Sequence, residues 1–212
     1  MAQRKVVVIG GNGQLGSAAT RGALDSGALV TVMSRRARQQ DPGTVAVKGS
    51  ITAIDDLREV LTAADAVIVS VEADWTPSGL RSVYVDGMKN VLAATSADTH
   101  IVFMGNIGVT DDSRMPDYNR AKRDAEELLR RSGKKYTILR PAWIVSGPTG
   151  AKLEQGDRYT GRRDDVSDGQ LAQAIRAILT HSEEANGKTF ELYGGSQDLD
   201  WPTALKTLNP DK

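Results

Sequence analysis

The stretch VVVIGGNGQLG, residues 6–16, decides the fold class of this chain of 212 residues. Its apolar, β-branched start predicts a short buried strand, and the glycine-rich run that follows satisfies both the GxGxxG and the GxxGxxG spacing, of which one should apply. Glycines allow a tight turn, a close approach of the backbone to a pyrophosphate and close packing of a helix on the strand. A strand, this turn and a helix in succession indicate a dinucleotide site, although glycines alone could also mark a turn that needs flexibility. The predicted phosphate-binding residues are Gly10, Gly11, Asn12, Gly13, Gln14, Leu15 and Gly16.

Short β-branched runs alternate along the chain with longer segments of helical periodicity. The expected strands are 6–9, 29–33, 45–47, 66–69, 101–104, 136–139 and 189–192, and the expected helices are 14–26, 54–63, 79–95, 117–132 and 168–181. This alternation predicts a parallel sheet with crossover helices, and Gly27 and Gly133 stand where helix-ending glycines belong. We predict a Rossmann-type, doubly wound α/β fold, with a mostly parallel sheet and helices on both faces, in a single NAD(P)-binding domain over residues 1–212.

One long segment, residues 146–165, is rich in glycine and charged residues and contains no convincing periodic element. In doubly wound folds, ligands bind outside the carboxyl ends of the strands, and a long connection there often covers the ligand. We interpret this segment as a mobile flap on the substrate side, and an ordinary surface loop is the alternative.

Composition narrows the function classes. The 27 basic residues balance 27 acidic ones, so no long-range field draws the chain to nucleic acid or an anionic membrane. Cysteine is absent, which excludes disulfides and thiol catalysis, and no clustered ligands suggest a metal centre. No run approaches the roughly 20 apolar residues that cross a bilayer, and the amino terminus leads straight into the first strand. We expect a cytoplasmic protein whose partner is a small molecule, without nucleic acid, membrane or metal.

The end of the second predicted strand indicates which dinucleotide is bound. In the Rossmann pattern an acidic residue there hydrogen-bonds the ribose hydroxyls and excludes a phosphate. This chain has no acid at that place and offers Ser34, Arg35 and Arg36 instead. Because the planar guanidinium suits a phosphate, the sequence predicts NADP(H) rather than NAD(H). The alternative is a solvated basic run that continues to Arg38.

Several later segments, taken in order, resemble those of the atypical, NmrA-like branch of the short-chain dehydrogenase/reductase family. The segments that carry the resemblance are VKGS (47–50), ADAV (64–67), VDGMKNV (85–91), YTILRP (136–141) and RDDVS (163–167). The resemblance covers nearly the whole chain and implies an NAD(P)-binding protein with a Rossmann core. It also implies that Gly49 and Ser50 lie in the part of the cofactor site around the adenine.

The family's catalytic signature, Tyr-x-x-x-Lys, appears as Tyr118 and Lys122 in the helix after the fifth predicted strand. Four residues along a helix bring the lysine beside the tyrosine on one face, where its charge favours the phenolate. A free tyrosine has a pKa of about 10, so such help is needed before it can act as a general acid near neutrality. The resemblance further implies that Lys122 holds the nicotinamide ribose.

The end of the fifth predicted strand departs from the family pattern. Where the family usually carries one or two serines that orient and polarise the substrate carbonyl, this chain has Gly105 and Asn106. The amide of Asn106 could donate a hydrogen bond in place of the serine, which makes it the third catalytic candidate. The alternative is that Asn106 is a turn residue.

Few other side chains are candidates for the substrate end. The apolar residues that either face the nicotinamide or belong to the core are Met104, Ile107 and Trp143. The aromatic residues that either line the substrate site or anchor the core are Trp75, Trp143, Tyr159 and Trp201. Thr110 adds a hydroxyl near the fifth strand, and both histidines, His100 and His181, are interpreted as structural.

Two function classes remain open after these observations. The first is an NADPH-dependent oxidoreductase that reduces a small carbonyl, quinone or flavin-like acceptor, either with Tyr118 as the acid or with the nicotinamide simply stacked on the acceptor. The second is a non-catalytic NADPH/NADP-sensing regulatory protein of the NmrA-like type, because a fold does not decide its function. A weaker third possibility is a module that keeps the turn for stability. We favour the enzyme, and a monomer over a homodimer because the solvent faces of the predicted helices 79–95 and 117–132 are charged.

Overall fold

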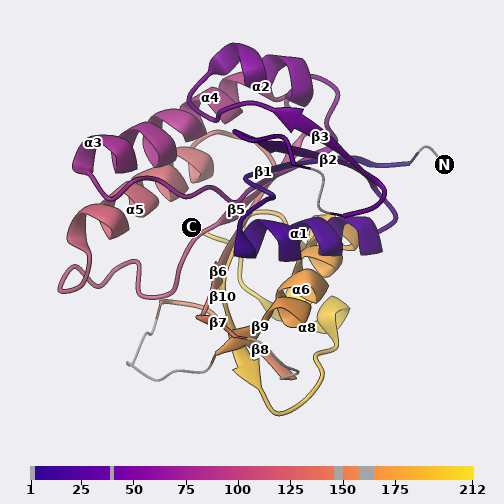
Figure 1. Ribbon diagram of the computed structural model, residues 1–212. Helices are drawn as coiled ribbons and strands as arrows, with labels where there is room; N and C mark the ends of the chain where they lie inside the picture. Colours follow the sequence, from indigo (N-terminus) through magenta and orange to yellow (C-terminus); the bar gives the residue numbers. More distant parts are fainter. Residues whose placement is uncertain (1–2, 39–40, 146–149, 158–164) are drawn as a thin grey trace.

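The computed structural model describes residues 3–38, 41–145, 150–157 and 165–212, and within them an eight-stranded sheet runs through the molecule (Figure 1). In spatial order its strands are β3 (Thr44–Lys48), β2 (Leu29–Ser34), β1 (Lys5–Ile9), β4 (Ala66–Val69), β5 (His100–Met104), β6 (Tyr136–Pro141), β10 (Lys188–Gly195) and β8 (Gly150–Glu154). Neighbouring strands are parallel except that β8 is antiparallel to β10. A small parallel pair joins β7 (Ile144–Val145) to β9 (Val166–Ser167). The predicted Rossmann-type α/β class is confirmed.

Helices cover both faces of the sheet. On one face lie α1 (Gln14–Asp25), α6 (Asp168–Thr180), α7 (Ser182–Ala185) and α8 (Trp201–Thr207). On the other face lie α2 (Ile54–Leu61), α3 (Pro77–Leu80), a π-helix (Arg81–Asp86), α4 (Gly87–Ala94) and α5 (Pro116–Arg130). Among the described residues, no helix is both long enough and apolar enough to cross a membrane.

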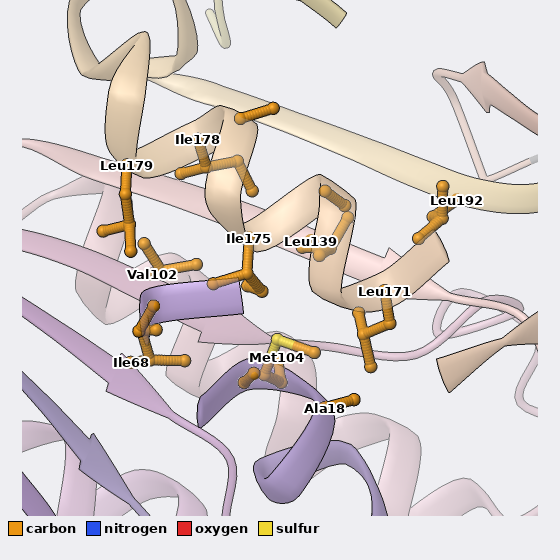
Figure 2. Packing of buried hydrophobic residues seen from close by; sticks show 14 of the residues in the cluster. Ala18, Ile68, Val102, Met104, Leu139, Leu171, Ile175, Ile178, Leu179 and Leu192 are labelled. Carbon is orange, nitrogen blue, oxygen red and sulfur yellow. The ribbon is translucent and has the colours of Figure 1, made fainter. Parts of the chain in front are cut away.

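The alternation of side chains along the central strands builds two separate cores. In β1, Val6 and Val8 face the layer of α1 and α6, whereas Val7 and Ile9 face the layer of α2, α4 and α5. Figure 2 shows side chains of α6, among them Ile175, packed over residues of β4, β5 and β6. Strands buried on both faces need continuous apolar runs, which is why they were recognisable in the sequence.

The predicted helix 79–95 is not one α-helix. The chain forms the short α3, then the π-helix over 81–86, and then α4, so the helix begins at Pro77 and ends at Ala94. A π-helical turn holds more residues than an α-helical turn, so it rotates the side chains that follow. Tyr84 lies in this turn and is 2% exposed. A period of 3.6 residues in the sequence cannot reveal such a change of register.

The segment 146–165 contains regular structure that the sequence did not indicate. Residues 150–154 form β8, which pairs with the end of β10 and so extends the sheet. Residues 146–149 and 158–164 lie outside the described part of the chain. The interpretation of this segment as a flap over the substrate stays a prediction.

The contact between α1 and α6 provides a test of the packing. A Cβ added to Gly22 in α1 would lie 2.3 Å from the carbonyl oxygen of Ala172 in α6. We expect Gly22→Ala to lower the free energy of unfolding by up to about 2 kcal/mol, because overpacking costs about 1–3 kcal/mol and the gain in helix propensity returns about 1 kcal/mol. Urea unfolding would measure the change through its midpoint.

Gly169→Ala is the matched control for this experiment. Gly169 lies in the first turn of α6, and the nearest atom to an added Cβ is 3.6 Å away. This variant should be as stable as the wild type or more stable by about 0.5–1 kcal/mol. If both variants had the same stability, α1 would not pack on α6 as closely as described.

Candidate functional site

A cleft of about 1250 Å³ opens at the carboxyl ends of the parallel strands. It lies where the strand order reverses between β1 and β4, which is the ligand position in doubly wound folds. All predicted cofactor and catalytic residues line it except Gly11. The topology therefore brings together residues that lie more than 100 positions apart in the sequence.

Packing inside the protein explains three of the four glycines in the turn. A Cβ on Gly10, where φ is +84°, would lie 2.1 Å from the Ser70 carbonyl oxygen, and a Cβ on Gly16 would lie 2.2 Å from the Gly10 carbonyl oxygen. A Cβ on Gly11 would lie 2.7 Å from Val32, on the side away from the cleft. Gly13 is different, because its nearest neighbour would be an ordinary 3.6 Å away. The bare backbone of Gly13 thus fits a ligand that approaches closely at the start of α1.

The amino terminus of α1 is open to an anion. Gly13 is the N-cap, no side chain of the described residues caps the helix, and its first turn contains no acidic residue. Free amide groups and the helix dipole at such an end favour a phosphate. The side chain of Asn12 donates to Ser34 Oγ at 2.7 Å, which ties the turn to the end of β2. Asn12 Oδ1 is buried and has no partner in the part of the chain that the structure describes.

The basic end of the cleft follows β2. Arg35, Arg36 and Arg38 are exposed there, and no ion pair found in the described part of the chain involves them. Ala37 adopts a positive φ of 44°, which turns the chain back at this point. The amide of Gly49 donates to the Ser34 carbonyl oxygen at 3.1 Å, so the adjoining loop closes the same end.

Lys122 is almost fully buried at the centre of the cleft wall. Its Nζ donates to the carbonyl oxygen of Met104 at 2.8 Å and lies 4.4 Å from the centre of the Tyr84 ring. Only 4% of the side chain surface is exposed. Burial lowers the pKa of Lys122 to about 8, despite the carboxylates of Glu126 and Glu72 nearby. The charge of this lysine can therefore change close to neutral pH.

Tyr118 lies against two aromatic rings. Trp75 stacks on it with ring centres 5.0 Å apart, and Tyr84 meets it edge-on at 5.6 Å. Burial raises the pKa of Tyr118 to about 12, and the Tyr84 hydroxyl opposes this shift only in part. The expectation that Lys122 favours the phenolate differs from the structure, because burial dominates and Lys122 binds Met104 instead. Tyr118 is a neutral hydrogen-bond donor near pH 7.

The side chain of Asn106 presents an acceptor rather than a donor. Asn119 donates through Nδ2 to three backbone carbonyl oxygens, so its Oδ1 must be an acceptor. Asn106 therefore turns its own Nδ2 to Asn119 Oδ1 at 3.3 Å and to the Ile107 carbonyl oxygen at 3.1 Å. Its Oδ1 is buried and has no hydrogen-bond partner among the described residues. The donor that the sequence suggested as a replacement for serine is thus already engaged.

Three residues of the site had no role in the sequence analysis. Tyr84 was hidden by the register change of the π-helix. Glu72 lines the cleft just after β4, and its charge raises the pKa values of Tyr118, Tyr84 and Lys122. Asn119 stood inside the Tyr-x-x-x-Lys motif, but its hydrogen bonds depend on a loop that only the fold defines.

The remaining candidates divide between the cleft and the core. The candidates that line the cleft are Trp75, Met104, Ile107 and Trp143. Met104 is also part of the core at 1% exposure, and Trp201 packs partly buried against that core away from the cleft. Tyr159 lies outside the described residues.

Neither of the two histidines lines the cleft. His100 is buried and shares a hydrogen bond with Thr137 at 2.9 Å, and burial lowers its pKa to about 4. His181 ends α6. No cluster of three metal-ligating side chains was found in the part of the chain that the structure describes.

Comparisons with known proteins agree with this geometry. A family model of NAD(P)H-binding proteins matches residues 10–182. The photosystem II assembly factor Ycf39 of Cyanophora paradoxa is 29% identical over 152 residues, which cover 68% of this chain and 47% of that protein. The chain spans about half the length of the curated relatives it matches.

Solved structures agree in fold over almost the whole chain. An oxidoreductase from Lactococcus lactis has a TM-score of 0.79 at 16% identity and covers 96% of both chains. A short-chain dehydrogenase/reductase from Veillonella parvula in complex with NADP has a TM-score of 0.68 at 19% identity and covers 91% of this chain and 95% of that one. The chain therefore belongs to the NAD(P)H-binding family, and it has a Rossmann-type fold.

Proposed function

We propose that this protein is an NADPH-dependent oxidoreductase that passes a hydride to a flat, largely apolar acceptor of the quinone or flavin type. The proposal rests on one observation, which is that the two ends of the cleft differ in their chemistry. Its first end has exposed arginines and an open helix terminus, and its other end has exposed aromatic side chains beside Tyr118 and Lys122. A cleft of about 1250 Å³ has room for a dinucleotide and a second ring system.

The choice of NADPH rests on the basic end. Arg35 and Arg36 are exposed, line the cleft and follow a strand end without an acidic residue. A guanidinium binds a phosphate with two parallel hydrogen bonds, and an arginine that is not already paired can do so without breaking an ion pair. Ser34 adds a hydroxyl at the place where the ribose would lie.

The acceptor class rests on the other end. Trp75, Met115 and Trp143 line the cleft and are 61%, 45% and 53% exposed, although large apolar side chains gain stability when water is excluded from them. The loop of Trp75 is tied to α3, because Thr76 donates to Asp74 Oδ1 at 2.7 Å and caps this helix. A flat acceptor that covers these surfaces would be held by stacking and burial.

The chain's own residues would orient the acceptor and manage the proton. NADPH, when bound, supplies the hydride. Tyr118 keeps its proton near neutral pH and can donate a hydrogen bond to an acceptor oxygen. Lys122 carries a positive charge below about pH 8, which favours negative charge on the reduced acceptor. A quinone or flavin needs no strong acid for hydride transfer, which suits a site where the Asn106 donor is engaged.

A second candidate function is a dinucleotide-sensing or assembly protein without turnover. Two observations favour this function. The pKa of Tyr118 is raised rather than lowered, and a relative is named as an assembly factor, although this chain spans only about half of its length. Such a protein would bind NADPH but would consume it with no acceptor. Nicotinamide fluorescence for binding and loss of NADPH absorbance for turnover, measured with quinones, flavins and aldehydes, would distinguish the two functions.

The basic end predicts cofactor selectivity. We expect the double substitution Arg35→Ala with Arg36→Ala to raise the Kd for NADPH about 10-fold to 100-fold, because a hydrogen bond to a charged group contributes about 1.5–3 kcal/mol. The Kd for NADH should change less than about 3-fold, since NADH lacks the extra phosphate. Arg58→Ala, an exposed arginine on α2, is the control. Equal weakening for both dinucleotides would contradict the assignment of this end to the phosphate.

The end of the cleft that carries Trp75 and Trp143 predicts an effect on the binding of the acceptor alone. Trp75→Ala should raise the KM for a quinone about 10-fold, because it removes a stacking surface worth about 0.5–1.5 kcal/mol together with its buried area. The Kd for NADPH should stay within about 2-fold. Leu29→Ala, which removes an exposed apolar side chain outside the cleft, serves as the control. An unchanged KM would show that the acceptor does not lie against Trp75.

The buried lysine predicts a pH dependence. Lys122 is protonated below about pH 8 and neutral above it, so kcat should decline as the pH rises through that value. Lys122→Met should lower kcat and remove this decline. Tyr118→Phe should retain it, because the pKa of Tyr118 is about 12 and this group does not titrate in the range. A decline that persists in Lys122→Met would assign it to another group.

A further inference from the structure

The connection between β5 and α5, residues 105–115, carries Asn106 and Ile107 into the cleft without forming a helix or a strand. A loop without regular hydrogen bonding holds one conformation only when other groups bind its backbone. At its start, Gly105 rests on the buried Arg140 and Glu126 pair, because an added Cβ would lie 2.9 Å from atoms of both. The rest of the loop needs other partners.

Side chains of α5 bind the carbonyl groups of this loop. Asn119, which is 2% exposed, donates to the carbonyl oxygens of Gly108, Asp111 and Arg114 at 2.8–3.2 Å. Arg123 donates to the carbonyl oxygen of Val109. These contacts satisfy acceptors and leave the amides of Gly108 and Thr110 to be bound from another side.

Asp157 binds those amide donors. Its Oδ1 accepts from the Gly108 amide at 2.7 Å, and its Oδ2 accepts from the amide and the hydroxyl of Thr110 at 2.7 and 2.6 Å. Both carboxylate oxygens therefore receive hydrogen bonds from backbone amides, which are strong when the acceptor is charged. Gly108 has a φ of +68° and is held through its amide by Asp157 and through its carbonyl by Asn119.

Asp157 comes from a distant part of the chain that is anchored to the sheet. It follows β8, which pairs with β10, and Gln155 binds the Thr189 carbonyl oxygen at 3.0 Å and the backbone of Asn209. Asp157 itself adopts a φ of +51°, which is unusual for a residue with a side chain and costs free energy. A strained residue whose carboxylate accepts three hydrogen bonds from a loop of the cleft suggests a function for the strain.

We propose that Asp157 is a positioning residue that fixes residues 106–110 against the nicotinamide end of the cleft. This inference rests on the proposed function, because it assigns the loop a place beside the reacting rings. Hydride transfer depends on the distance between two bound rings, and a displacement of about 1 Å can reduce the rate about 100-fold. Asp157 itself does not line the cleft, so it acts through Asn106 and Ile107.

The substitution Asp157→Asn is a sharp test. The side chain keeps its size, but one carboxylate oxygen becomes an NH₂ group that faces a backbone amide and cannot accept from it. Thr110→Val removes only the hydroxyl contact and keeps both amide contacts, so it should have a small effect. Asp55→Asn, at an exposed position of α2 outside the cleft, controls for the loss of a negative charge.

Amide hydrogen exchange measures how well the amides of the loop are held, and it does not require turnover. Asp157→Asn should accelerate exchange at Gly108 and Thr110 at least 10-fold. The Gly105 amide, which donates to the Leu139 carbonyl oxygen at 2.8 Å, should be unaffected in the same spectra. Unchanged exchange at Gly108 and Thr110 would overturn the proposal whatever the protein catalyses.

Binding and turnover distinguish positioning from a purely structural role. In Asp157→Asn we expect the Kd for NADPH to stay within about 3-fold of wild type and at least half of the nicotinamide fluorescence enhancement to be lost. Where an acceptor is reduced, kcat should be lower than in wild type by at least 10-fold. If wild type binds NADPH but reduces no acceptor, the proposed enzyme fails, and the fluorescence enhancement still decides the role of Asp157. If exchange at Gly108 and Thr110 is faster but the fluorescence enhancement and kcat are both unchanged, the positioning role of Asp157 is overturned.

Discussion

Three backbone segments meet in this protein at distances that exclude any side chain, and the rest of the site depends on that contact. The turn after β1 touches the end of β4 at Gly10, and the start of α1 touches the same turn at Gly16. A methyl group at either position would lie about 2 Å from a carbonyl oxygen. Because β4 and β2 flank β1 on opposite sides, this contact sets the point where the sheet divides and the cleft opens.

The two apolar cores leave the carboxyl end of the sheet as the place for chemistry. Strands such as β4 and β5 are buried on both faces, so their side chains serve packing rather than binding. Polar and charged groups of the site come from the ends of the strands and the turns that follow them, as Ser34 does at the end of β2 and Glu72 after β4. Tyr118 and Lys122 are exceptions, since both reach the cleft from α5, and Lys122 loses most of its hydration in doing so.

The parts of the structure that follow from local pattern could be predicted from the sequence. Continuous apolar runs marked the central strands, and the glycine spacing marked the turn. Features that depend on contacts between distant segments could not. Nothing local separates Trp75, which is exposed in the cleft, from Trp201, which packs against the core, and nothing near Asp157 indicates that its carboxylate binds a loop nearly 50 residues away. The role of the Asn106 amide could not be predicted either, because its Nδ2 binds Asn119 Oδ1 through a contact that exists only in the fold.

The two ends of the cleft differ in how they are held, and this difference bears on their roles. Arg140 pairs with Glu126 and Glu191 beneath the loop after β5, and such a buried network contributes little net stability but fixes geometry when its partners are well placed. Arg35 and Arg36 at the other end are exposed and held by no ion pair in the described residues. A phosphate can be bound by a flexible guanidinium in several arrangements, whereas hydride transfer between two rings would require one arrangement or a few. Rigidity is therefore concentrated where a reaction would require it, and flexibility where only charge must be matched.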